Sequence, residues 1–288
     1  MKHISKITAI ALLATLSACE GSDMPIQQAD NHGYISFSAQ PQKTATRANP
    51  YEAYDPTRHP ATMGTFGYYD MPKRYASAAN TIFNNETATY NVATYGWDTA
   101  TKKRWTEYTK ASSFDFFAYM PYTGGATLLR TANNTYTLSF PFAMSDGGNP
   151  VPVIYDTKAA PIICAVPSSK GAISDSNGGG TVSLKFDQTL TGYKLLFMLG
   201  TKMNAIRHFR IKSVTLSGCF STSCTISRSY VWNTTSKSWS ASAITWSDIK
   251  RQSFVETPFP IAYKGYGSAD YDDNTQTVIV TSAGYTQW

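Results

Sequence analysis

Residues 34–39 carry the sequence Tyr-Ile-Ser-Phe-Ser-Ala. Polar and apolar side chains alternate in this stretch, which predicts a half-buried β-strand with Ile35, Phe37 and Ala39 on its buried face. A loose segment, Gln40 to Thr46, follows and leads to Arg47-Ala48. Because an arginine in an exposed linker is easily cut by a trypsin-like protease, we expect cleavage after Arg47 to detach the strand. The alternative interpretation makes Arg47 an ordinary linker residue.

The residues before this strand form a secretion signal. Lys2 and Lys6 precede an apolar run from Ile7 to Leu16, which is too short to remain in a bilayer as a spanning helix. The run ends in Leu16-Ser17-Ala18-Cys19, which resembles the lipobox of bacterial lipoproteins. The resemblance implies a signal peptide over residues 1–18, acylation of Cys19 and a lipidated pro-segment over residues 19–47. Lipid chains would then hold the protein at a membrane, since each buried methylene contributes about 0.8 kcal/mol.

Composition favours an exported protein rich in β-structure. Charged residues make up 15% of the 288-residue chain, whereas an average soluble domain has about 25%. Aromatic residues reach 14%, and the formal net charge is +6. No block of basic residues stands outside short runs such as Lys102-Lys103-Arg104, which we interpret as a solvated turn. The composition therefore argues against nucleic acid as a partner.

Alternating apolar patterns and frequent turn residues predict an all-β fold built from β-sandwiches. The densest strand pattern is Phe114-Asp115-Phe116-Phe117-Ala118-Tyr119-Met120-Pro121-Tyr122, which we place at the centre of a sheet as core packing. Residues 168–180 are rich in Ser, Gly and Asp and end in three glycines, which predicts a linker. We therefore expect one sandwich over residues 48–167 and a second over residues 181–288.

The sequence contains no recognised catalytic motif. His59 and His208 are far apart in the sequence, and no nucleophile elbow or zinc-protease motif is present. Asp270, Asp272 and Asn274 have the spacing that opens a calcium loop, but Thr275 and Thr281 replace its required Gly and Glu. We therefore predict a non-enzymatic protein with no metal and no cofactor.

Cys219 and Cys224 are the cysteines whose spacing leaves two interpretations open. In an oxidising compartment they could close a small loop as a disulfide, or they could remain two thiols whose Cα atoms are wrongly placed for a bond. Cys164 lies in an apolar segment and is expected to be a small buried residue.

Several short motifs, taken in order, resemble the fimbrillin family, the lipoprotein precursors of type V pili. The motifs are Leu16-Ser17-Ala18-Cys19, Thr46-Arg47-Ala48, the Trp97/Trp105 pair, Phe117-Ala118-Tyr119-Met120-Pro121-Tyr122, Phe186-Asp187-Gln188-Thr189-Leu190 and Val214-Thr215-Leu216-Ser217-Gly218. The resemblance implies two transthyretin-like β-sandwich domains in tandem. It also implies cleavage between Arg47 and Ala48 and loss of the preceding strand. The groove left behind would accept a strand from the next subunit.

This resemblance predicts a surface-exposed fimbrial subunit or adhesin at the cell outer membrane. Its partners would be other fimbrial subunits, the membrane through acylated Cys19, and a host or bacterial surface receptor. The second half is shorter than the family pattern and lacks its closing Trp-Gly-aromatic motif, so a truncated chain or an accessory or tip subunit is the alternative to a stalk polymer. Val278, Ile279 and Val280 form the candidate donor strand. A surface glycan-binding lipoprotein of a nutrient-uptake system would share these features and is the alternative function.

Overall fold

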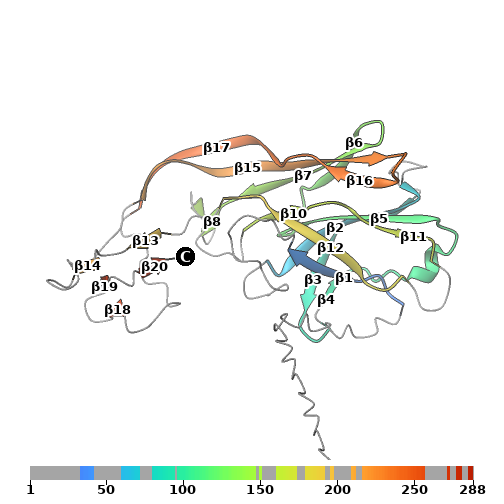
Figure 1. The fold of residues 1–288 in the computed structure, drawn as a ribbon, viewed down its shortest axis with the longest axis horizontal. Helices are drawn as coiled ribbons and strands as arrows, with labels where there is room; N and C mark the ends of the chain where they lie inside the picture. Colours follow the sequence, from blue (N-terminus) through green and yellow to red (C-terminus); the bar gives the residue numbers. More distant parts are fainter. Residues whose placement is uncertain are drawn as a thin grey trace, which may run out of the picture.

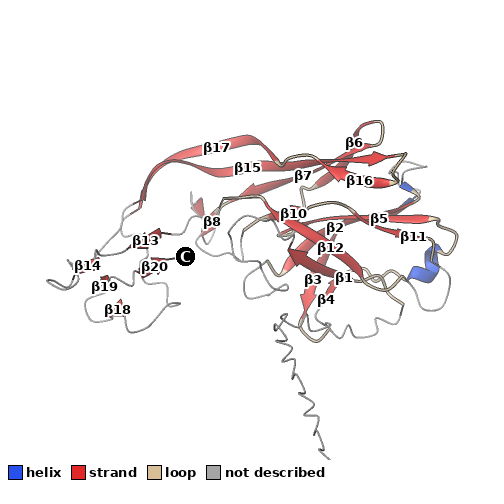
Figure 2. Ribbon diagram, in the orientation of Figure 1, coloured by secondary structure: helices blue, strands red, loops and turns tan. Residues whose placement is uncertain are grey.

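The structure is a computed structural model of the chain, and it is all-β (Figures 1 and 2). It describes residues 33–41, 60–71, 80–94, 96–146, 149–150, 160–173, 179–191, 195–197, 209–211, 216–256, 271–272, 277–280 and 285–287. Two large sheets account for most of these residues, and Figure 1 shows one layered over the other. The strand patterns of the sequence predict an all-β fold, and the observed strands confirm this prediction.

The first sheet closes partly on itself. Its order is β10-β12-β1-β4-β3-β2-β5-β11, and β10 also pairs with β5, so that all of these strands except β11 form a partial barrel. The strands are β1 (Phe37–Pro41), β2 (Thr62–Tyr69), β3 (Thr81–Asn91), β4 (Gly96–Thr99), β5 (Ser113–Met120), β10 (Ile162–Cys164), β11 (Ser168–Gly171) and β12 (Val182–Gln188). A 3₁₀ helix, η2 (Trp105–Tyr108), follows β4.

The second sheet lies over the barrel and has the order β16-β15-β7-β6, with β17 paired to β15. Its strands are β6 (Thr127–Ala132), β7 (Thr135–Ala143), β15 (Leu216–Asn233), β16 (Ser238–Ala241) and β17 (Thr245–Glu256). β15 is long enough to pair with β17 from Leu216 to Ser227 and with β16 from Tyr230 to Asn233. Register shifts at Ser221, Ser223 and Thr225 mark where β15 bends.

β5 joins the two layers because both of its faces are apolar. Phe114 and Phe116 contact Trp105 on the barrel side. On the other face Phe117 contacts Tyr230, and Tyr119 stacks on Phe140 of β7 at a ring-centroid distance of 4.4 Å. The prediction that residues 114–122 form a central core strand is therefore confirmed over β5, and the two layers share one continuous core.

Four further short pairings complete the described strands. They involve β8 (Ser145–Asp146) with β9 (Asn149–Pro150), β13 (Leu195–Phe197) with β20 (Tyr285–Gln287), and β19 (Thr277–Val280) with both β14 (Phe209–Ile211) and β18 (Tyr271–Asp272).

The division of the chain differs from the predicted domains. Within the predicted linker 168–180, β11 pairs with β5, and the strand that follows, β12, joins the same sheet as β1. β6 and β7 precede that segment and β15 follows it, yet they form one sheet. The polar composition misled the prediction because β11 is an edge strand, and an edge strand can expose polar side chains to water.

Candidate functional site: the slot that holds the N-terminal strand

Strand β1 lies inside the first sheet and not at its edge. On one side it runs parallel to β12, with Phe37 opposite Val182 and Ala39 opposite Leu184. On the other side it meets β4 through the antiparallel pair of Phe37 and Trp97. Figure 1 shows β1 and β12 side by side across the front of the barrel. We refer to the space between β12 and β4 that β1 fills as the β1 slot.

The apolar side chains of this strand are buried, as its alternation predicts. The exposed fractions of Ile35, Phe37 and Ala39 are 2%, 0% and 7%. The ring of Phe37 makes edge contacts with Phe83 and Phe116, at centroid distances of 5.8 and 5.7 Å. Full burial of a side chain such as Ile or Phe contributes about 1.5–3 kcal/mol, so β1 is a substantial part of the barrel core.

Hydrogen bonds hold residues 34–36, which lead into β1. The backbone N–H of Ile35 donates to the carbonyl of Lys103 at 2.8 Å, and the N–H of Val182 donates to the carbonyl of Ser36 at 2.8 Å. Arg104 donates to the hydroxyl of Tyr34 at 2.9 Å, and its guanidinium carbon lies 4.7 Å from the centre of the same ring. These contacts place the chain before β1 against the segment that follows β4.

The tryptophans Trp97 and Trp105 both lie beside the slot. Trp97 on β4 faces Phe37 across the strand pair and packs against Tyr90. Trp105 is buried under Phe114 and Phe116, and its Nε1 donates to the carbonyl of Gly180 at 3.1 Å, just before β12. Both tryptophans therefore line the core next to β1.

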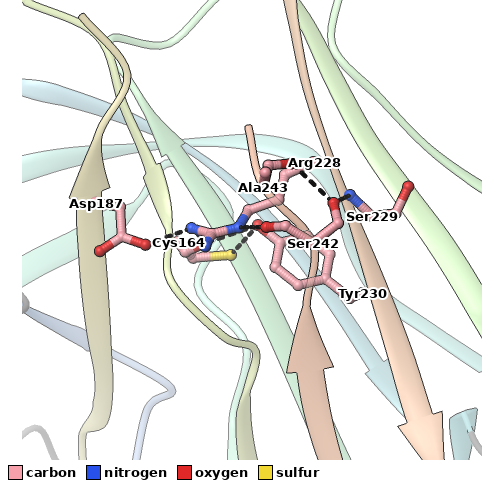
Figure 3. Close-up of polar contacts among 7 residues, drawn as sticks. All are labelled: Cys164, Asp187, Arg228, Ser229, Tyr230, Ser242 and Ala243. Carbon is pink, nitrogen blue, oxygen red and sulfur yellow. Dashed lines mark hydrogen bonds and ion pairs between the residues drawn. The ribbon is translucent and has the colours of Figure 1, made fainter. Parts of the chain in front are cut away.

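A polar cluster ties the far side of β12 to the second sheet (Figure 3). Arg228 on β15 forms an ion pair with Asp187 at 2.6 Å, and its Nε donates to the carbonyl of Ser242 at 3.0 Å. Tyr230 donates to the carbonyl of Cys164 at 2.7 Å. Burial raises the pKa of the Cys164 thiol to about 11, so this cysteine is an unreactive thiol of the core.

Sequence reasoning missed the role of Arg228. Its partner Asp187 stands in a motif quoted for the family resemblance, but nothing in the spacing of the two residues indicates that they meet. They meet where β12 of the first sheet faces β15 of the second sheet. The alternation of polar and apolar residues does not show which strands become neighbours. The pair matters for the slot because β12 is one of its two walls.

The remaining predicted site residues are distributed as follows. Cys19, Arg47 and Ala48 lie outside the described residues. The candidate donor residues Val278, Ile279 and Val280 belong to β19, where Ile279 pairs with Arg210 of β14.

Cys219 and Cys224 lie on the single strand β15, and both thiols are free. The disulfide is therefore not formed. Five residue steps along the strand place the two Cα atoms about 17 Å apart, far beyond the reach of a disulfide.

Metal-binding clusters and membrane-spanning helices are both absent from the described residues. Among them, no group of three or more His, Cys, Asp or Glu side chains is placed to hold a metal ion. The same part of the chain contains no helix long and apolar enough to cross a bilayer.

The fold and the slot define an all-β protein whose partial barrel is completed by an N-terminal strand. No family model matches the sequence, and no curated protein matches it. One solved structure to which the chain is similar is described as a "putative cell adhesion protein" from Bacteroides ovatus. The sequence identity is 12%, the TM-score is 0.39, and the alignment covers 89% of this chain and 86% of the other.

Proposed function

We propose that the protein is a lipid-anchored fimbrial subunit or adhesin of the type V pilin kind, which assembles by protease-triggered strand exchange. The fimbrillin-like motifs of the sequence suggest this class. The observation that carries the proposal is the position of β1, an N-terminal strand with buried side chains between two walls of one sheet.

Removal of β1 would leave a defined vacancy. The β1 slot would expose the apolar side chains against which Phe37 packs and leave unpaired backbone groups along β12. Exposed backbone groups of this kind attract another strand, and apolar pockets at alternate positions would set its register. A strand supplied by a second subunit satisfies both requirements.

The candidate donor has suitable chemistry. Val278 and Val280 are two residues apart, as Ile35 and Phe37 are, so they can point to the same face of a strand. In the structure β19 pairs with β14 and β18, so donation requires β19 to leave those partners. Head-to-tail repetition of this contact would give an open filament. Acylation of Cys19 would hold the uncleaved precursor at the outer membrane.

Limited proteolysis of the purified full chain tests the proposal. We expect an arginine-specific protease, which leaves the Lys43–Thr44 bond intact, to produce a chain that begins at Ala48, to release the peptide that carries β1, and to yield oligomers in native mass spectrometry. An Arg47→Gln variant should remain monomeric under the same conditions, and Val278→Asp should be cleaved without forming oligomers. A cleaved chain that keeps β1 bound, or loses it and stays monomeric, would contradict strand exchange.

A further inference from the structure

A second site lies away from the β1 slot, at the loop between β5 and β6. It is an open pocket of about 500 Å³ between β3, this loop and β6. Its lining residues are Asn84, Asn85, Tyr122, Gly124, Ala126, Thr127, Leu128 and Leu129. β6 is an edge strand of the second sheet, at the upper right of Figure 1.

The β3 side of the pocket is formed by a β-bulge. Phe66 pairs with Asn84 and Thr65 pairs with Glu86, which leaves Asn85 as the extra residue, with φ +52°. Asn tolerates this left-handed conformation better than most residues. A bulge redirects the side chains beside it, and here it places Asn85 against the loop while the side chain of Asn84 remains exposed.

The loop is held by a partly buried network of hydrogen bonds. Asn85 Nδ2 donates to the carbonyl of Thr123 at 2.9 Å. The hydroxyl of Tyr119 lies 2.6 Å from the same carbonyl and 2.7 Å from Asn85 Oδ1, and it accepts from the N–H of Thr123 at 3.0 Å. Since these groups satisfy one another, the pocket is formed before any ligand arrives, which lowers the entropic cost of binding.

The lining defines the chemistry of the ligand. None of the lining residues is charged, which disfavours phosphates, carboxylates and amines. Asn84 offers an exposed amide, Thr127 and Tyr122 each offer an exposed hydroxyl, and the ring of Tyr122 and Leu129 supply exposed apolar surface. A saccharide combines neutral hydroxyl groups with an apolar ring face, and this lining provides partners for both.

We propose that this pocket binds a neutral saccharide, with the ring of Tyr122 under the sugar face and Asn84 and Thr127 as hydrogen-bond partners. The assignment does not require strand exchange, because no residue of β1 or of its walls lines the pocket. An adhesin would use such a site for a surface glycan, and a nutrient-uptake lipoprotein would use it for a food polysaccharide.

The test is binding of the intact protein to an array of neutral hexose and N-acetylhexosamine oligosaccharides, followed by titration of the best binder. We expect Tyr122→Ala and Asn84→Ala each to weaken binding at least tenfold, and Tyr122→Phe to retain it. Trp246→Ala is the matched control, because Trp246 is an aromatic residue of similar exposure, 47% against 37% for Tyr122, on β17 outside the pocket.

Three results would overturn the assignment: no neutral saccharide binds, only acidic glycans bind, or binding survives both Tyr122→Ala and Asn84→Ala. A peptide that adds to the free edge of β6 is the competing occupant. It would be recognised by binding that persists in both variants and is lost when β6 is altered by Leu129→Pro. Cleaved and uncleaved protein should bind alike, so failure of this site and failure of strand exchange are distinguishable.

Discussion

Gly64 on β2 lies directly beneath the side chain of Tyr119. A Cβ atom built at this position would come closer than 3.0 Å to three atoms of Tyr119, whose ring is itself stacked on Phe140. We expect Gly64→Ala to lower the free energy of unfolding by about 1–3 kcal/mol, because overpacking forces side chains off their preferred positions. Urea denaturation measures this change. Gly171→Ala is the control, since its Cβ would meet nothing within 4 Å, and equal effects of the two substitutions would contradict the argument.

Asp115 is a buried carboxyl between the layers. Its Oδ1 accepts from Ser169 Oγ at 2.5 Å and from Trp239 Nε1 at 2.8 Å, while Oδ2 is buried without a partner among the described residues. Burial raises the pKa of Asp115 above its ordinary value near 3.8, although the hydrogen bonds from Ser169 and Trp239 oppose the shift. The folded protein therefore holds this proton to higher pH than the unfolded chain.

This shift fixes the sign of a pH effect. Below pH 3.8 Asp115 is protonated in both the folded and the unfolded chain and does not lower the free energy of unfolding. As the pH rises from 3.8 toward the folded-state pKa, the unfolded chain loses this proton first. The free energy of unfolding then falls by about 1.4 kcal/mol per pH unit while the folded state holds the extra proton. We expect Asp115→Asn to remove this dependence and to gain stability relative to the natural protein between pH 4 and pH 7. Thermal unfolding of both proteins across that range is the measurement. A constant difference between them at every pH would contradict the prediction.

At the scale of elements, the ion pair of Arg228 and Asp187 holds one wall of the β1 slot. The side chains are 11% and 19% exposed, so removing one partner leaves the other charge poorly solvated. We expect Arg228→Met to destabilise the fold by about 2–4 kcal/mol and Arg228→Met with Asp187→Leu to recover much of the loss. Hydrogen exchange of the β12 amides should accelerate in the single variant.

The matched control for this pair is Lys102→Met. It breaks the pair of Lys102 and Asp98, which is 3.2 Å long and 47% and 29% exposed. Exposed pairs contribute about 0–1 kcal/mol, so this variant should be nearly neutral. If both variants changed the free energy of unfolding equally, the ion pair of Arg228 and Asp187 would not be what holds β12 in place.

The sequence predicts individual strands better than it predicts which strands pair with each other. Alternation identifies the buried face of β1, because a period-two pattern reports burial on one face, and a continuous apolar and aromatic run identifies the core strand β5, which is buried on both faces. It could not show that Phe37 pairs with Val182 or that Arg228 reaches Asp187, since sheet order depends on contacts between distant segments. The pocket at Asn85 was missed for the same reason: a bulge is a mismatch between two strands, and one strand alone carries little sign of it.

At the scale of the whole molecule, each large sheet draws strands from both sides of residues 174–178. The barrel needs β12 as well as β1 to β5, and the second sheet needs β15 as well as β6 and β7. Trp239 of the second sheet contacts Phe117 and donates to Asp115 on β5 of the barrel, so the layers share side-chain contacts and one core. We therefore expect the two layers to unfold together, in contrast to two independent tandem domains.

Calorimetry and guanidinium denaturation of the chain from Cys19 onward can decide this. Far-UV circular dichroism and tryptophan fluorescence should give coincident transitions for the layered core, because Trp97 and Trp105 report on the barrel and Trp239 on the junction of the layers. A fragment of residues 48–180 should fail to fold, since it lacks β1, β12 and β15. Two separate transitions from these tryptophans, or a folded fragment, would mean that the barrel does not depend on the C-terminal strands.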